Sequence, residues 1–108
     1  MRLHVSFAVA AFLVSAASAA PVAQDMTVVN GTHFAVLAIK VKGANGAWQP
    51  DILKGNTLGI GQVRKVALPS GTPCKVDLVA ILNDGHKVLI AGKNACSNAA
   101  VAITDNRK

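Results

Sequence analysis

Cys74 and Cys96 are the only cysteines of the chain, and they enclose its longest stretch of regular apolar pattern. The N-terminal segment predicts export, and two cysteines in an exported protein most simply form one disulfide. The alternatives are two free thiols or a metal site. Zinc would need four ligands, and the other candidates, His33 and His86, have unsuitable spacing. We therefore predict a Cys74–Cys96 disulfide, no metal and no other cofactor.

The hydroxyl and imidazole groups of the chain do not form a recognisable nucleophilic site. Catalysis by a nucleophile requires a Ser, Thr or Cys beside a base that a third group orients. Ser70 and Ser97 lie in segments with turn composition, and His33 and His86 flank turns. A histidine beside a turn is usually only solvated. We predict no catalytic residues.

The acidic residues do not indicate paired-carboxylate or calcium chemistry. Asp51, Asp77 and Asp84 are the only acids in the middle of the chain, which has no Glu, and they do not cluster in the sequence. Asp84 already has a turn role in Asp84-Gly85. Gly59-Ile60-Gly61 lacks the third glycine, the helix and the acidic residue of a dinucleotide site, so a bent strand entry explains it better.

The chain is basic, with 11 Lys and Arg against 5 Asp and a formal charge of +6. An anionic envelope component or an unidentified protein could therefore be its partner. The basic residues are spread in ones and twos, which is also what solubility alone would require. Lys75, Lys87 and Lys93 are the best candidate for a basic interaction patch. Phe34 and Trp48 alone provide no stacking platform, so we expect no sequence-specific binding to nucleic acid.

The first twenty residues have the three-part plan of a secretory signal peptide. Met1 to His4 carries Arg2, Val5 to Val14 is apolar apart from Ser6, and Ser15 to Ala20 contains only Ser and Ala. The apolar run is too short for a transmembrane helix, which needs about 20 apolar residues. The alternative is an uncleaved membrane anchor.

Ala17-Ser18-Ala19 fits the A-x-A cleavage pattern and divides the chain into a signal peptide, 1–19, and one mature domain, 20–108. The mature chain then has 89 residues, enough for one domain with a modest core. Its formal charge is +5, because Arg2 is lost. We expect a periplasmic or secreted protein without a transmembrane segment in its mature part.

The mature chain reads as a series of short strands separated by turns, without an amphipathic helix. Turn signals such as Asn30-Gly31, which also begins a glycosylation sequon, recur every eight to twelve residues. This pattern predicts an all-β fold, a small antiparallel β-sandwich of about six strands, of the immunoglobulin-like or a similar kind, with one disulfide. The expected strands are 25–30, 34–42, 62–68, two strands in a hairpin between the cysteines, and 101–103.

The register of the hairpin follows from its apolar pattern. A three-residue loop, Asn83-Asp84-Gly85, is a type I turn followed by a glycine bulge. With this loop, one face of the hairpin is apolar and the opposite face carries Lys75, Asp77, Lys87 and Lys93. A slip of one residue would exchange the faces of one strand and mix apolar and charged residues. The predicted pairs are Leu82 with His86, Ala80 with Val88, Leu78 with Ile90, Val76 with Gly92 and Cys74 with Asn94.

Two further packing predictions concern the segment before the hairpin. In the strand 34–42, strict alternation places one apolar set on a single face: Ala35, Leu37, Ile39 and Val41. Between Pro50 and Gly55 only a helical turn fits. We expect Trp48, Ile52 and Leu53 to form a lid that plugs one end of the core.

Several of these features together resemble a group of small exported proteins that occur widely in alphaproteobacteria. They are Val29-Asn30-Gly31-Thr32, Trp48 with Asp51 and Leu53, Cys74-Lys75-Val76-Asp77-Leu78, Asp84-Gly85 and Asn94-Ala95-Cys96. This chain departs from the group at Gln49, where Gly often follows the Trp, and at Val76, where an aromatic residue is common. The resemblance implies a periplasmic setting, a Trp plug and a disulfide-clasped hairpin, and no enzymatic activity.

The function that these observations favour is a non-enzymatic, exported binding or envelope-accessory protein. The alternative is a secreted inhibitor of an enzyme, since small disulfide-bonded β proteins suit that task. Inhibitors of basic lysozymes would be acidic for electrostatic complementarity, which makes that target unsuitable for a basic chain.

Overall fold

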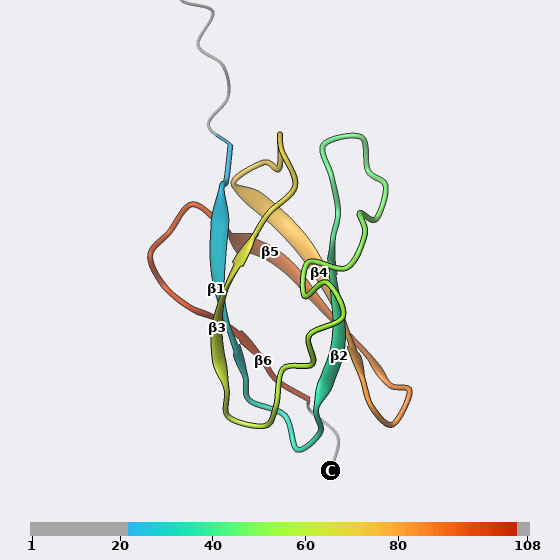
Figure 1. Cartoon of the computed structure of the whole chain (residues 1–108). Helices are drawn as coiled ribbons and strands as arrows, with labels where there is room; N and C mark the ends of the chain where they lie inside the picture. Colours follow the sequence, from blue (N-terminus) through green and yellow to red (C-terminus); the bar gives the residue numbers. More distant parts are fainter. Residues whose placement is uncertain (1–21, 106–108) are drawn as a thin grey trace, which may run out of the picture.

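The computed structural model describes residues 22–105, which form two packed β-sheets and contain no helix (Figure 1). The predicted signal peptide, 1–19, lies outside the described residues. Each sheet has three strands, in the orders β3-β1-β6 and β2-β4-β5. The strands are β1 (Asp25–Asn30), β2 (Val36–Val41), β3 (Val63–Ala67), β4 (Lys75–Leu82), β5 (Lys87–Asn94) and β6 (Val101–Ile103). The prediction of an all-β sandwich is confirmed.

One strand pairing differs from the purely antiparallel arrangement that we predicted. β1 pairs with β3 in antiparallel fashion, but with β6 in parallel, Val28 lying opposite Val101. The second sheet is antiparallel throughout. Parallel neighbours need a crossover connection. Between β1 and β6 this connection includes β3 and the entire second sheet, so the chain builds the other layer before it returns to the edge of β1.

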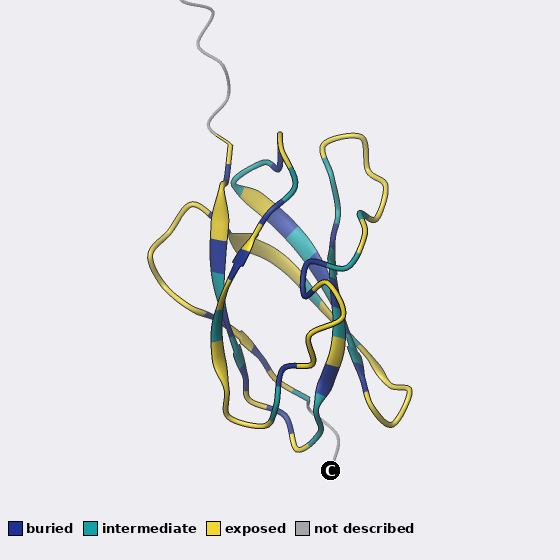
Figure 2. Cartoon of the chain, in the orientation of Figure 1, coloured by how far each residue is buried: buried dark blue, intermediate teal, exposed yellow. Residues whose placement is uncertain are grey.

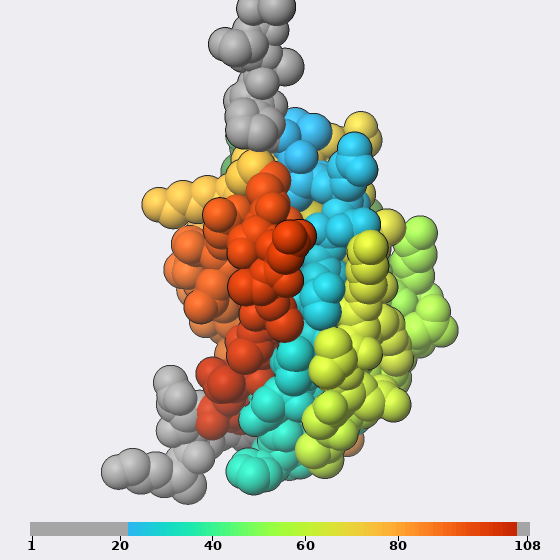
Figure 3. Space-filling model, turned by 90° about the vertical axis from the view of Figure 1, so that its left-hand side faces the viewer, coloured from blue at the N-terminus to red at the C-terminus, as the bar shows by residue number. Residues whose placement is uncertain are grey.

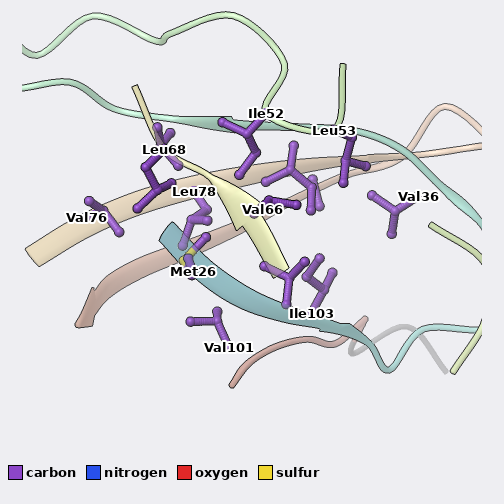
Figure 4. Packing of buried hydrophobic residues seen from close by; sticks show 14 of the residues in the cluster. Met26, Val36, Ile52, Leu53, Val66, Leu68, Val76, Leu78, Val101 and Ile103 are labelled. Carbon is purple, nitrogen blue, oxygen red and sulfur yellow. The ribbon is translucent and has the colours of Figure 1, made fainter. Parts of the chain in front are cut away.

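The core lies between the sheets and is built from alternate residues of their strands (Figures 2 and 4). β4 shows the cleanest alternation, with Val76, Leu78, Ala80 and Leu82 at most 2% exposed. In Figure 4, Met26 of β1 lies close to Leu78 of β4. Side chains from the connecting segments complete the core: Ala23, Ile52, Leu53, Leu58, Leu68 and Ala95.

A bulge in β2 overturns the predicted face of this strand. Val36 pairs with Leu82 and Ala38 with Ile81, so Leu37 is an extra residue without a partner of its own. Strict alternation placed Leu37 inward, but its side chain is 44% exposed while Val36 is fully buried. A bulge changes the phase of alternation, so Val36 joins Ile39 and Val41 on the inner face.

The segment from Trp48 to Leu58 covers the outer edge of β2 and supplies the predicted lid. Ile52 N donates to Ile39 O (2.8 Å). Asp51 Oδ1 accepts from Ile39 N and Leu53 N, both at 2.9 Å. Ile52 and Leu53 are buried as predicted, at 5% and 3% exposure. The prediction for Trp48 is wrong, because this side chain is 42% exposed and does not plug the core.

The β4–β5 hairpin confirms most of the predicted register. Leu82 N donates to His86 O (2.8 Å), which closes the three-residue loop. Ala80 lies opposite Val88 and Leu78 opposite Ile90, as expected. Beyond this point the register shifts by one, because Gly92 forms a bulge with φ of 67° and its N–H donates to Asp77 Oδ1 (2.9 Å). Val76 therefore pairs with Lys93 instead of Gly92.

The predicted disulfide is present between Cys74 and Cys96, whose Cα atoms are 5.0 Å apart. Because of the shifted register, Lys75 pairs with Asn94, and Ala95 N donates to Cys74 O. Cys96 is thus one residue past the partner of Cys74, rather than two as the predicted register implied. The bond closes the open end of the hairpin, at the opposite end from its turn.

Asn30 at the end of β1 is fully buried, and its side chain makes four hydrogen bonds. Nδ2 donates to Phe34 O (2.8 Å) and Leu58 O (3.1 Å), and Oδ1 accepts from Thr32 N (3.0 Å) and Oγ1 (2.7 Å). The neighbouring Gly31 N donates to Ile103 O (2.8 Å). The sequon at Asn30 therefore has no amide available for a glycan in the folded state.

Replacing Asn30 by Asp should destabilise the fold by about 3 kcal/mol or more, because both donors vanish and a buried carboxylate faces two carbonyl oxygens. Urea unfolding of residues 20–108 measures this change. Asn45→Asp is the matched control, since exposed Asn45 only accepts a bond from Ala47 N through Oδ1. Equal stability of the two variants would contradict the role given to Asn30.

Replacing Cys74 and Cys96 together by Ala should lower the free energy of unfolding by about 3 kcal/mol, the entropy of closing a loop of this size. The urea midpoint should fall accordingly. A reductant should lower the midpoint of the wild-type protein and leave that of the double variant unchanged. A wild-type midpoint that does not respond to reductant would refute this prediction.

Candidate binding surface

The outer face of the β2-β4-β5 sheet carries an apolar strip. Val79 and Ile81 of β4 point outward between the buried residues of that strand and are half-buried. Leu89 of β5 lies directly opposite Val79 and is 66% exposed. Apolar side chains directly opposite each other on neighbouring strands are in contact range, so these residues form one continuous surface.

Trp48 stands at the side of this strip because a short turn brings it back against β2. The chain turns at Gly43 to Gly46, Lys42 forms a β-bridge with Trp48, and Gln49 N donates to Val41 O (2.8 Å). Lys42 Nζ lies 5.1 Å from the centre of the Trp48 ring. A cation within about 6 Å of an indole face is attracted to it, which holds the ring on the surface.

A hollow of about 190 Å³ lies on this face. Its walls are Trp48, Val79, Ile81, Lys40 and Lys87. Two lysines therefore flank an apolar floor that has an indole at its side. An apolar floor with few polar groups at its rim is typical of binding sites. Here the charged groups at the rim are both cationic, which favours a partner with negative charge.

The structure does not bring the three lysines of the predicted patch together. Lys87 pairs with Ile81, six positions along β4 from Lys75, which corresponds to about 20 Å. Lys93 pairs with the inward-facing Val76, so the Gly92 bulge moves Lys93 off the face shared by Lys75 and Lys87. Only Lys87 belongs to the hollow beside Trp48.

Sequence reasoning missed Lys40, Lys42 and Trp48 as members of one surface. The alternation of the strand 34–42 correctly predicts Lys40 and Lys42 on its polar face. The missing step was the turn at Gly43 to Gly46, whose short length returns Trp48 to the level of Lys42. An exposed lysine pair followed by a glycine turn and a tryptophan could have indicated this arrangement.

The residues considered for catalysis lie apart from this surface or have structural roles. His33, His86, Ser70 and Ser97 are exposed in turns and loops. Asp84 Oδ1 accepts from His86 N (3.0 Å) within the hairpin turn. Among residues 22–105, no three His, Cys, Asp or Glu side chains group together as metal ligands would.

Asp51 and Asp77 have structural hydrogen bonds as well. Asp51 accepts three backbone N–H bonds within the lid and from β2, the third from Gly55 N (3.0 Å) to Oδ2. Asp77 Oδ1 holds the Gly92 bulge. In the part of the chain that the structure describes, every buried side-chain nitrogen and oxygen has a hydrogen-bond partner, so no buried polar atom there awaits a ligand.

Comparisons with known proteins support the fold. No family model and no curated protein matches the chain. Among solved structures, the chain is similar to the NMR structure of a protein from Eubacterium rectale, with a TM-score of 0.57 and 24% identity. The match covers 79% of this chain and 80% of that one. The likeness therefore extends over most of the sandwich and concerns the fold alone. Within residues 22–105, no helix is long and apolar enough to cross a membrane.

Proposed function

We propose that this chain is an exported, non-enzymatic binding protein that uses the outer face of its β2-β4-β5 sheet to hold an anionic partner. The single observation that carries the proposal is the exposed Trp48 beside a hollow with an apolar floor and two flanking lysines, Lys40 and Lys87. Exposed tryptophan at the edge of an apolar patch is a frequent centre of binding energy.

Export to the periplasm or the outside of the cell is part of this proposal. The Cys74–Cys96 disulfide supports it, because disulfides persist in oxidising compartments and are rare in the cytosol. The signal-peptide pattern of residues 1–19 and the resemblance to small exported alphaproteobacterial proteins point the same way. The partner is then a component of the cell envelope, or an unidentified protein, that carries negative charge.

The shape of the surface fits binding better than turnover. The hollow is small, and its lining residues include no acid, histidine, serine or cysteine that could act as a base or nucleophile. Lysines with an apolar floor provide attraction and desolvation, which are the requirements of recognition.

A broad hydrolase screen of residues 20–108 should show no turnover. Turnover that is lost on replacing His33 or His86 would overturn the non-enzymatic assignment.

Combining Lys40→Glu with Trp48→Ala should reduce capture of the partner from an envelope fraction by at least about tenfold, because the change reverses a flanking charge and removes the exposed ring. Immobilised wild-type and variant proteins, residues 20–108, are compared at low and high salt. Thermal unfolding shows whether the variant is folded.

The matched control combines Lys65→Glu with Val63→Ala on β3, in the other sheet. Both side chains are exposed, so this variant has the same charge change and removes a smaller exposed apolar side chain. It also breaks the exposed Lys65–Asp25 ion pair (3.4 Å), so its thermal unfolding is measured as well. It should capture like the wild type. Equal losses in both variants would refute the assignment to the β2-β4-β5 face. Recovery of a stoichiometric enzyme that the protein inhibits would favour the alternative of a secreted inhibitor.

A further inference from the structure

β5 has a neighbour on only one side. In the order β2-β4-β5 it is an edge strand of eight residues, as long as the central strand β4. The bond from Leu82 N to His86 O fixes which residues face β4. Hydrogen-bonded and non-bonded pairs alternate in an antiparallel ladder. Val88 and Ile90 therefore bond to β4, and the N–H and C=O groups of Lys87 and Leu89 point away from it.

Within residues 22–105, these outward groups make no backbone hydrogen bond. The opposite edge of the same sheet is treated differently. Val36 N donates to Leu58 O and Leu58 N to Val36 O, both at 2.9 Å, and Ile52 N donates to Ile39 O. Within residues 22–105, the chain thus covers the edge of β2 with an entire segment and places no backbone partner along the edge of β5.

A hollow of about 380 Å³ lies along this open edge, between β5 and the segment that contains β6. In Figure 3 the orange surface of β5 lies beside the red surface of the segment that follows it. Lys87 to Ala91 and Lys93 form one wall, and Ala102, Thr104 and Asp105 form the other. The hollow places lysines toward both ends of β5, with the exposed Leu89 between them.

The positions of Lys87 and Lys93 decide between two possible partners for the edge of β5, a second copy of this chain and an extended acidic segment. Two copies paired in antiparallel fashion about Ile90 would place Lys87 of one copy opposite Lys93 of the other. Like charges across strands are destabilising, and lysine on an edge strand is a common protection against self-pairing. An extended segment with acidic side chains is attracted by the same two residues. The single carboxylate in the lining, Asp105, lies on the opposite wall.

We propose that β5 accepts an extended acidic segment of a partner protein as an added antiparallel strand. Main-chain hydrogen bonds to Lys87 and Leu89 would supply affinity, as in other cases of strand addition. Side chains of paired residues share a face. The segment therefore presents an apolar residue opposite Leu89 and, two positions later, an acidic residue opposite Lys87. The intervening residue faces the hollow beside Ala102 and Thr104. This inference rests on the proposed binding function and names the chemistry of the partner.

The test uses a dye-labelled peptide, Thr-Val-Thr-Asp-Thr-Val-Thr-Asp, and fluorescence anisotropy with residues 20–108. Leu89→Pro removes the outward N–H without removing a bond to β4, and proline is tolerated on edge strands with the N–H side outward. Leu89→Thr is the matched control, because it removes the same side chain and keeps the amide. Leu89→Pro should weaken binding at least about tenfold, and Leu89→Thr less than about threefold.

Two peptide controls separate backbone pairing from charge alone. Methylation of the peptide's bonding amides should abolish binding, and Lys in place of Asp should reduce it strongly. Equal affinity of the methylated peptide, or equal losses for Leu89→Pro and Leu89→Thr, would overturn strand addition. Circular dichroism establishes that both protein variants are folded. A dimer seen by sedimentation without peptide, and lost in Leu89→Pro, would assign the edge to a second copy and overturn the acidic-segment proposal.

Envelope capture separates this inference from the proposed function. If Leu89→Pro captures the partner like the wild type while the Lys40→Glu/Trp48→Ala variant does not, the binding function stands and strand addition fails. If the peptide binds as described but capture is insensitive to the Lys40→Glu/Trp48→Ala change, the assignment of the partner to the sheet face fails and the edge site stands.

Discussion

The buried amide of Asn30 is the interaction on which the arrangement of the two sheets depends. A side chain with two donors and two acceptor positions is required where the chain leaves β1 for β2, because three backbone segments converge there. Nδ2 adds a second hydrogen bond to Phe34 O and to Leu58 O, which also accept from Thr32 Oγ1 and Val36 N, and Oδ1 accepts from Thr32 N. Buried polar groups without partners are costly. The adjacent Gly31 bonds to Ile103 at the end of β6, so the same corner also fixes the last strand.

Much of the fold could be predicted from the sequence because its strands are short and regular. β4 alternates perfectly, so its inner face and its pairing with β5 near the turn followed from the pattern alone. The bulges at Leu37 and Gly92 could not be predicted in this way. Each depends on tertiary contacts: Val36 is fixed by Leu58, and Gly92 by Asp77. Periodicity describes a regular strand and contains no information about such phase changes.

The candidate surface was harder to predict than the fold, for a related reason. Trp48 is the largest apolar side chain of the chain, and burial was the natural expectation. The structure instead buries the smaller Ile52 and Leu53 at the lid and leaves the indole beside Lys42. Lys75, Lys87 and Lys93 looked like a patch only while the hairpin was treated as regular. Which side chains share a surface depends on how neighbouring strands are aligned. A bulge such as that at Gly92 therefore separates residues that a regular hairpin would place on one surface, while the core changes little.

The Cys74–Cys96 disulfide is compatible with the strand register that the Gly92 bulge produces, and not with the register of a regular hairpin. In a hairpin without the bulge, Cys96 would lie two residues beyond the partner of Cys74, about 6.6 Å along the strand. Added to the spacing between strands, this would separate the Cα atoms by about 8 Å, too far for a bond. With the bulge they are 5.0 Å apart. The bond therefore excludes the unbulged alignment, so a chain that is oxidised before it folds reaches the sandwich only through the bulged register.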